Sequence, residues 1–289
     1  MIVSIIGLGL IGGSLAISIR ENEFAKRIIG VDSSNKNAED ALESRLVDEI
    51  TNIETAVPLA DLIIIAVPVD QTKLILPKVL DGINKNSTVI DVGSTKEGIC
   101  RTADQHHNRG NFVATHPIAG TENYGPLAAI PGLFNDKLSI ICDCERSFDF
   151  AILRTERLYK SLGMKIINMK SKEHDLHAAY VSHLSHISSF TLGLTVLEIE
   201  KNEETIFELA GSGFASTVRL AKSSPDMWAP IFDQNSKHLL EALNAYIKNL
   251  QLFKKLIEKK QTKEIYNLMK EANDIGRILE GNKLIKEKH

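Results

Sequence analysis

The first half of the chain alternates short apolar runs with longer stretches of mixed polarity. Apolar runs of strand length are typical of strands buried on both faces, as in a parallel sheet covered by helices. This alternation predicts a doubly wound α/β sheet. The predicted strands are Ile2–Ile6, Arg27–Val31, Leu62–Ala66, Thr88–Asp91, Phe112–Thr115, Leu138–Cys142 and Lys165–Asn168, and a helix is predicted over Phe150–Leu162 before the last of them.

After Met169 the stretches have the period and length of helices. We therefore predict two domains, a Rossmann-type, mainly parallel sheet over residues 1–168 and an all-helical domain over 169–289. A length of 289 residues suits this division, because single cores stop growing near about 250–300 residues. The predicted helices of the second domain are Lys172–Lys201, Glu203–Lys222, Asn235–Glu258 and Lys263–Glu280.

The predicted helix Asn235–Glu258 carries a broad apolar stripe, which must be buried. It packs either within its own domain or against a second subunit, and several wide stripes in a small helical domain favour a homodimer. The stripe consists of Leu239, Ala242, Tyr246, Phe253 and Leu256, widened by Leu240, Leu243, Ile247, Leu250 and Ile257.

Charge and composition exclude several classes of partner. A net charge of −3 offers no general attraction to nucleic acid. We find no basic leader at the N-terminus and no apolar run of the roughly 18 residues that a membrane span needs, so we expect a cytoplasmic protein. Three cysteines without a CxxC pair fit a reducing compartment, and we assign them no function.

A glycine motif, Gly7-x-Gly9-x-x-Gly12, follows the first predicted strand and opens a helix. Gly7 permits a tight turn, Gly9 lets the backbone approach a pyrophosphate, and Gly12 allows close packing of helix and strand. Asp32 ends the second strand, where a carboxylate accepts hydrogen bonds from ribose hydroxyls and repels a 2′-phosphate. The motif therefore predicts NAD rather than NADP. The candidate cofactor contacts are Gly7, Leu8, Gly9, Leu10, Ile11, Gly12, Asp32, Ala66, Val67 and Pro68.

Polar groups follow two later strands, so we expect them at the carboxyl edge where ligands bind. Ser94 and His116 are expected to meet there. A neutral imidazole can take the proton of a substrate hydroxyl as hydride leaves the carbon that bears this hydroxyl, and a serine can orient the hydroxyl. We interpret Asp91 as a turn-former and Lys96 as a first-turn lysine, although Lys96 has the charge to neutralise a carboxylate.

Four histidines lie within Lys172–Lys201. At about 100° per residue, His174 and His177 would face away from His183 and His186. We therefore expect no four-histidine metal site. A two-histidine site is the alternative, but it has no evident third ligand and no HExxH pattern, and we predict no metal. Arg219 follows a glycine pair and has the fork geometry that binds a carboxylate; a surface salt bridge is the alternative.

Four motifs follow the glycine motif along the chain, in the order Asp91–Lys96, Thr115–Glu122, Ser182–His186 and Val218–Trp228. In this order they resemble the prephenate/arogenate dehydrogenase family of tyrosine biosynthesis, over about residues 1 to 280. The resemblance implies that His116 is the catalytic group, that Ser94 assists it, and that His186 and Arg219 bind substrate. It also implies a homodimer, because in that family the tryptophan, here Trp228, approaches from the neighbouring subunit. Thr121 and Glu122 match a loop at the mouth of the pocket, and we add His183 to the candidate substrate contacts.

The chain departs from the family pattern at two positions. Ser185 stands where the family often has proline, and the family frequently has a charged residue near the position of Ala215, on the segment that leads to Arg219. The implied reaction is the NAD-dependent oxidative decarboxylation of prephenate to 4-hydroxyphenylpyruvate. The alternatives are arogenate as substrate, a non-catalytic NAD-binding sensor and, more remotely, a β-hydroxyacid dehydrogenase.

Overall fold

An eight-stranded, mostly parallel sheet organises the first part of the chain. The computed structural model describes residues 1–121, 123–201, 205–279 and 281. The strand order is β3-β2-β1-β4-β5-β6-β7-β8, which begins with the order of a dinucleotide-binding sheet. The strands are β1 (Ile2–Ile6), β2 (Arg27–Val31), β3 (Glu49–Ile50), β4 (Leu62–Ile65), β5 (Thr88–Asp91), β6 (Phe112–Pro117), β7 (Leu138–Cys142) and β8 (Lys165–Met169).

The predicted doubly wound fold is confirmed, and three differences in the strands exceed a shift of one residue at a strand end. β3 was not predicted, because two residues give no periodic signal. β6 runs two residues further than expected, so His116 and Pro117 are part of the strand rather than of the loop after it. β7 is antiparallel to β6, with His116 opposite Ile140, whereas every other strand pair in the sheet is parallel.

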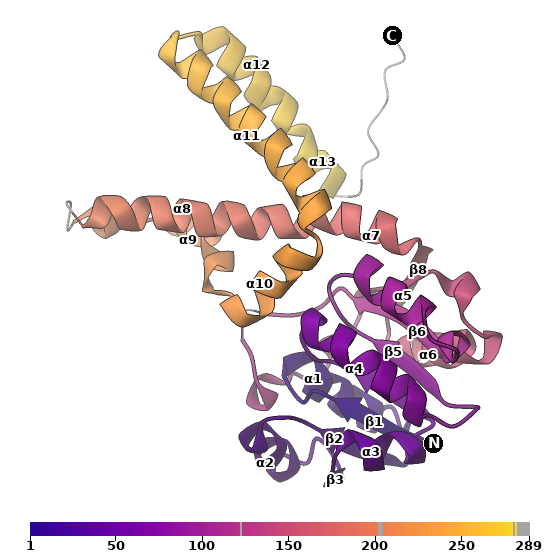
Figure 1. Ribbon diagram of the computed structural model, residues 1–289. Coiled ribbons are helices and arrows are strands. Elements are labelled where there is room, and N and C mark those ends of the chain that lie inside the picture. The colour runs from indigo at the N-terminus through magenta and orange to yellow at the C-terminus, as the bar shows by residue number, and fades with distance from the viewer. Residues whose placement is uncertain (122, 202–204, 280, 282–289) are drawn as a thin grey trace. The chain divides into compact units, whose positions relative to one another are not determined.

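Helices cover both faces of this sheet (Figure 1). Alternate side chains of β4 face opposite ways, so that Ile63 and Ile65 pack with α3, α4 and α5, while Leu62 and Ile64 pack with α1, α2 and α6. Both faces are therefore core, as the continuous apolar strands indicated. The helices are α1 (Leu10–Glu21), α2 (Asn35–Glu43), α3 (Ile53–Ala56), α4 (Val69–Gly82), α5 (Glu97–Asp104) and α6 (Asp149–Ser161), with 3-10 turns η1 (Val57–Leu59), η2 (Arg109–Asn111), η3 (Pro126–Ala128) and η4 (Cys144–Arg146).

The helices after β8 continue the same compact unit, which spans Met1–Leu239. α7 (Ser171–Ala178) and α8 (Leu184–Glu200) are joined by a π-helical turn, η5 (Ala179–His183), and form one continuous rod in Figure 1. α7 contacts α5, and α10 (Pro225–Gln234) contacts α4. This packing brings parts of the helical region to the sheet.

The predicted helix over Glu203–Lys222 is wrong. In its place lie three short elements, η6 (Ile206–Leu209), α9 (Ser212–Thr217) and η7 (Arg219–Lys222), while positions 203 and 204 lie outside the described residues. Gly211 and Gly213 lower the helix propensity of this stretch, which explains the interruption. Arg219 therefore lies in a 3-10 turn rather than on a long helix.

The second compact unit, Leu240–His289, is helical as far as the structure describes it. It contains most of α11 (Ser236–Glu258), α12 (Thr262–Ala272) and α13 (Asp274–Leu279). Large apolar side chains stay exposed on these helices, among them Leu250 at 50% and Ile257 at 62%. In the described part of the chain, no helix is both long enough and apolar enough to span a membrane.

Candidate active site

Two of the glycines of the loop between β1 and α1 occupy positions that exclude a side chain. Gly7 has a φ of +97°, and a Cβ there would lie 2.5 Å from the carbonyl oxygen of Ala66. A Cβ on Gly12 would lie 1.9 Å from the carbonyl oxygen of Gly7. The start of α1 therefore packs too closely on the loop after β1 to leave room for a side chain at Gly12. A Cβ on Gly9 would meet no atom of the described chain within 4 Å. The space beside Gly9 is thus open to a ligand.

Asp32 ties the glycine loop to the end of β2. One carboxylate oxygen accepts the N–H of Leu8 at 2.8 Å, and the other accepts the N–H of Ser34 at 2.8 Å. The N-terminus of α1 has Gly9 as its N-cap and no side-chain cap, so its N–H groups are directed at the open space. Ala66, Val67 and Pro68 follow β4 beside the loop. These residues fit a dinucleotide, with phosphates at the helix and a ribose at Asp32.

His116 lies on β6, which neighbours the strand that leads to Ser94. Its Nδ1 lies 2.8 Å from Nε2 of His174, and the two rings meet edge to face. Within the described residues, Nε2 of His116 has no hydrogen-bond partner, and the residue keeps some solvent exposure. Burial, together with His174, Lys96 and His183, holds the pKa of His116 well below its ordinary value of 6.5. His116 is therefore neutral at pH 7.

A carboxylate lies behind the histidine pair. Nδ1 of His174 is 2.8 Å from Oδ1 of Asp175, and both side chains are buried. The same carboxylate accepts the backbone N–H groups of Lys96 at 2.7 Å and Glu97 at 2.8 Å, at the N-terminus of α5. The peptide dipoles of a helix N-terminus favour a negative charge. His116, His174 and Asp175 thus form one hydrogen-bonded chain that joins β6, α7 and α5.

Lys96 is fully buried and forms an ion pair with the equally buried Asp91. Its Nζ also donates to the carbonyl oxygen of Thr115 at 2.7 Å. Burial raises the pKa of Asp91, and the Lys96 ammonium opposes this rise. Lys96 is the N-cap residue of α5, near where the sequence indicated, but its charge neutralises Asp91 inside the protein. The interpretation of Asp91 as a turn-former and of Lys96 as an ordinary first-turn lysine was therefore incomplete.

The π-helical turn η5 changes which histidines share a face. A π turn holds one extra residue and so rotates the residues after it by about 100° relative to a continuous α-helix. His174, His183 and His186 are all buried, while His177 is exposed. The expectation that His174/His177 and His183/His186 form two opposed pairs is therefore wrong.

The buried face continues to His186 and the tryptophan. The Trp228 ring stacks on His186 with centroids 3.4 Å apart, and it meets His183 edge to face. The resemblance implied a tryptophan from a neighbouring subunit, whereas this Trp228 belongs to the same chain as the histidines it contacts. Burial lowers the pKa of His186, and the nearby Arg219 guanidinium lowers it further. Arg219 therefore lies within electrostatic range of His186.

The remaining predicted residues lie in loops. Ser94 is partly buried between β5 and α5. Thr121 is partly buried after β6, and its hydroxyl accepts the N–H of Asn123 at 3.2 Å. Glu122 lies outside the described residues.

Two family models match the chain. "Prephenate dehydrogenase, nucleotide-binding domain" matches residues 15–168, and "Prephenate dehydrogenase, dimerization domain" matches residues 170–271. Together these matches cover more than half of the chain. The chain belongs to the prephenate/arogenate dehydrogenase family. It is therefore an oxidoreductase, and its cofactor is NAD.

Three members of the family are similar to this chain over nearly its whole length. Prephenate dehydrogenase of Bacillus subtilis is 32% identical over 93% of this chain and 73% of its own length. The crystal structure of prephenate dehydrogenase from Aquifex aeolicus in complex with hydroxyphenyl propionate and NAD+ is 30% identical, covers 96% of this chain and 97% of its own, and superposes with a TM-score of 0.87. Arogenate dehydrogenase of Synechocystis is 28% identical, with a TM-score of 0.78, and covers 96% of this chain and 100% of its own. Relatives with different substrates thus share this fold.

Sequence reasoning missed His174 and Asp175 as the hydrogen-bonded partners behind His116. The adjacent letters His-Asp carry no signal by themselves, since their value depends on His116, 58 positions earlier. The register that turns them inward depends on α7 packing against α5. The four histidines within one predicted helix were a usable signal. The prediction treated that helix as a continuous α-helix, however, and the π-helical turn η5 changes which histidines share a face.

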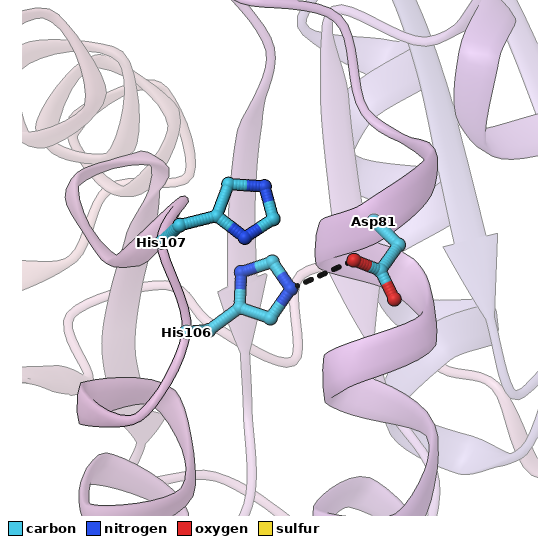
Figure 2. Close-up of side chains that lie close together, drawn as sticks. All are labelled: Asp81, His106 and His107. Atoms are coloured by element: carbon cyan, nitrogen blue, oxygen red, sulfur yellow. Dashed lines mark hydrogen bonds and ion pairs between the residues drawn. The ribbon is translucent and has the colours of Figure 1, made fainter.

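A second cluster of metal-binding residue types lies away from this site. Figure 2 shows the rings of His106 and His107 beside Asp81 of α4. The two rings are stacked, with their centroids 4.4 Å apart. Nδ1 of His106 accepts the N–H of Asn108 at 3.1 Å, so the proton of neutral His106 lies on Nε2, which donates to Asp81 at 3.0 Å. A metal would have to displace one of these bonds. We therefore assign the cluster a structural role, and the expectation of no metal stays a prediction.

Proposed function

We propose that this protein catalyses the NAD-dependent oxidative decarboxylation of prephenate to 4-hydroxyphenylpyruvate and CO2. One observation carries the proposal: Nε2 of His116, which has no hydrogen-bond partner among the described residues, lies on the strand beside the one that leads to Ser94. The likeness to the Bacillus subtilis enzyme and to the Aquifex aeolicus structure supports prephenate as the substrate.

His116 acts as the general base. Neutral at pH 7, it takes the proton of the ring hydroxyl at Nε2, while Ser94 orients that hydroxyl. NAD, when bound, supplies the acceptor for the hydride that leaves the same carbon. Loss of the ring carboxylate follows readily because it restores aromaticity. The glycine loop and Asp32 would hold this cofactor at the carboxyl edge of the sheet.

The two carboxylates of prephenate need cationic or hydrogen-bonding partners. Arg219 has the planar donor fork that binds a carboxylate in a bidentate manner. His186 lies within electrostatic reach of Arg219. Its Nδ1 donates to the backbone carbonyl oxygen of Ser182, so neutral His186 offers the substrate an acceptor at Nε2. We place His183 and Trp228 behind His186, and Thr121 and Glu122 at the mouth of the pocket.

We also propose that two chains associate through the helical region, residues 169–289, with NAD bound by residues 1–168. The helices leave large apolar side chains exposed to solvent, such as Leu194 with 68% and Ile257 with 62% of its surface exposed, and exposed apolar patches mark interaction surfaces. The family model that matches residues 170–271 is that of a dimerization domain. Analytical ultracentrifugation of the whole chain tests this, since a monomer at micromolar concentration would contradict it.

The deciding experiment is an assay for NADH formation with prephenate and, separately, with arogenate, each with NAD and with NADP. We expect turnover with prephenate and NAD. Arogenate is the second candidate, because an arogenate dehydrogenase has the same fold. Turnover with arogenate alone would replace the substrate assignment, and no turnover with either compound would overturn the proposed activity.

A further inference from the structure

The chain of hydrogen bonds from Asp175 to His116 has a defined direction. Asp175 receives two backbone N–H groups, so its oxygens act as acceptors, and Nδ1 of His174 must donate to it. A neutral His174 then has a lone pair on Nε2. Nδ1 of His116, 2.8 Å away, must therefore carry a proton and donate it to His174. The second nitrogen of His116, Nε2, is left with a lone pair.

We propose that His174 is a positioning residue that sets the tautomer of His116, with Asp175 setting the tautomer of His174 in turn. This inference rests on the proposed role of His116 as the base. A base must present a lone pair, and the other neutral tautomer of His116 would present an N–H to the substrate hydroxyl instead. His174 excludes that tautomer, because its own Nε2 accepts a proton and has none to offer.

The same chain stabilises the charge that the reaction creates. When the O–H bond of the substrate breaks and an N–H bond forms at Nε2, His116 becomes an imidazolium, and its bond to His174 becomes charge-assisted. Burial, His174, the Lys96 ammonium and the neighbouring His183 all lower the pKa of His116 and so oppose this charge. Asp91 neutralises Lys96, and the carboxylate of Asp175 lies behind His174. The proton returns to water after the product leaves.

The tautomer is measurable without any substrate. In protein labelled with 15N-histidine, the side-chain nitrogen shifts show which nitrogen carries the proton, and the His116 signals are identified by their loss in His116→Gln. At pH 7.5 we expect wild-type His116 to carry its proton on Nδ1 and to be unprotonated at Nε2. Protonation at Nε2 would overturn the proposal, whatever the substrate proves to be.

Kinetics with His174→Phe give the second arm. Phe keeps the ring but removes both nitrogens, so we expect kcat to fall by about 10- to 100-fold, as for other residues that orient a functional histidine. KM should change little, and His174→Gln, whose amide oxygen can accept from Nδ1, should recover part of kcat. The matched control is His177→Phe, an exposed position on the same helix.

Each outcome decides one claim. A folded His174→Phe protein with wild-type kcat, or a loss confined to KM, would overturn the positioning role. If His174→Phe does not fold, the tautomer of the wild-type protein still decides. Absence of all turnover in the wild-type protein would overturn the proposed function and leave the measurement of the tautomer untouched.

Discussion

The glycine loop and the histidine chain belong to the same sheet but are built in opposite ways. The loop is local, because Gly7, Gly9 and Gly12 lie within one turn and the start of one helix. The histidine chain joins β6, α7 and the start of α5, with partners 58 and 79 positions apart. The glycine loop requires positions without a side chain, whereas the histidine chain requires side chains that form hydrogen bonds with one another.

This difference teaches where sequence patterns carry function. A loop that must leave room can be recognised from glycine spacing, since each glycine has its own steric reason. A chain of hydrogen bonds has no such spacing, because tertiary packing brings its members together. Substitutions should therefore affect the two regions differently.

The largest effect is expected at His116. His116→Asn removes the base, so kcat with prephenate should fall by about 10²- to 10⁴-fold with little change in KM. Steady-state NADH formation measures this, with His177→Asn as the matched control on an exposed histidine. Unchanged turnover in His116→Asn would show that the histidine chain is not the catalytic site.

The substrate anchor comes next. Arg219→Ala should raise KM for prephenate by about 10- to 100-fold, because a lost charge-assisted hydrogen bond costs about 1.5–3 kcal/mol, and kcat should change less. Lys222→Ala removes the same charge from the same 3-10 turn and serves as the control. Equal effects of the two variants would point to a general charge effect rather than to a specific contact.

Two glycine variants separate the roles within the loop. Gly12→Ala places a Cβ 1.9 Å from the carbonyl oxygen of Gly7, and overpacking of this kind costs about 1–3 kcal/mol of folding free energy. Gly9→Ala meets no atom of the described chain within 4 Å and has an extended backbone, so the melting temperature should stay the same. Calorimetric titration with NAD should nevertheless show weaker binding in Gly9→Ala. Unaltered NAD affinity there would contradict the phosphate-binding role.

A smaller effect concerns the pH dependence of stability. Burial lowers the pKa of His183 to about 4 from 6.5, despite the opposing charge of Asp175. The unfolded chain therefore binds a proton near pH 6.5, while the folded chain binds it only near pH 4, so folding is destabilised as the pH falls. Between pH 7 and pH 5 this costs about 2 kcal/mol.

His183→Gln should remove this part of the loss, measured by urea unfolding at both pH values. His177→Gln is the control, because His177 is exposed. A pH dependence of His183→Gln equal to that of the wild type would show that His183 does not stay neutral in the folded protein.

Much of the fold could be predicted because its signals are local. Each of the seven predicted strands is present, at most two residues from its expected end, because buried strands need continuous apolar runs. The wrong helix over Glu203–Lys222 has a physical cause in Gly211 and Gly213, whose propensity competes with the apolar period. The two-residue strand β3 has too little sequence to produce a pattern.

The sequence by itself determined the glycine loop, Asp32 and the place of His116 at the carboxyl edge of the sheet, since these follow from spacing and strand order. Tertiary structure alone decided that Lys96 is buried against Asp91, and that η5 turns His174, His183 and His186 to one face. The physical reason is range: steric demands act between neighbours in the chain. A proton's location depends on every partner that folding brings within about 3 Å.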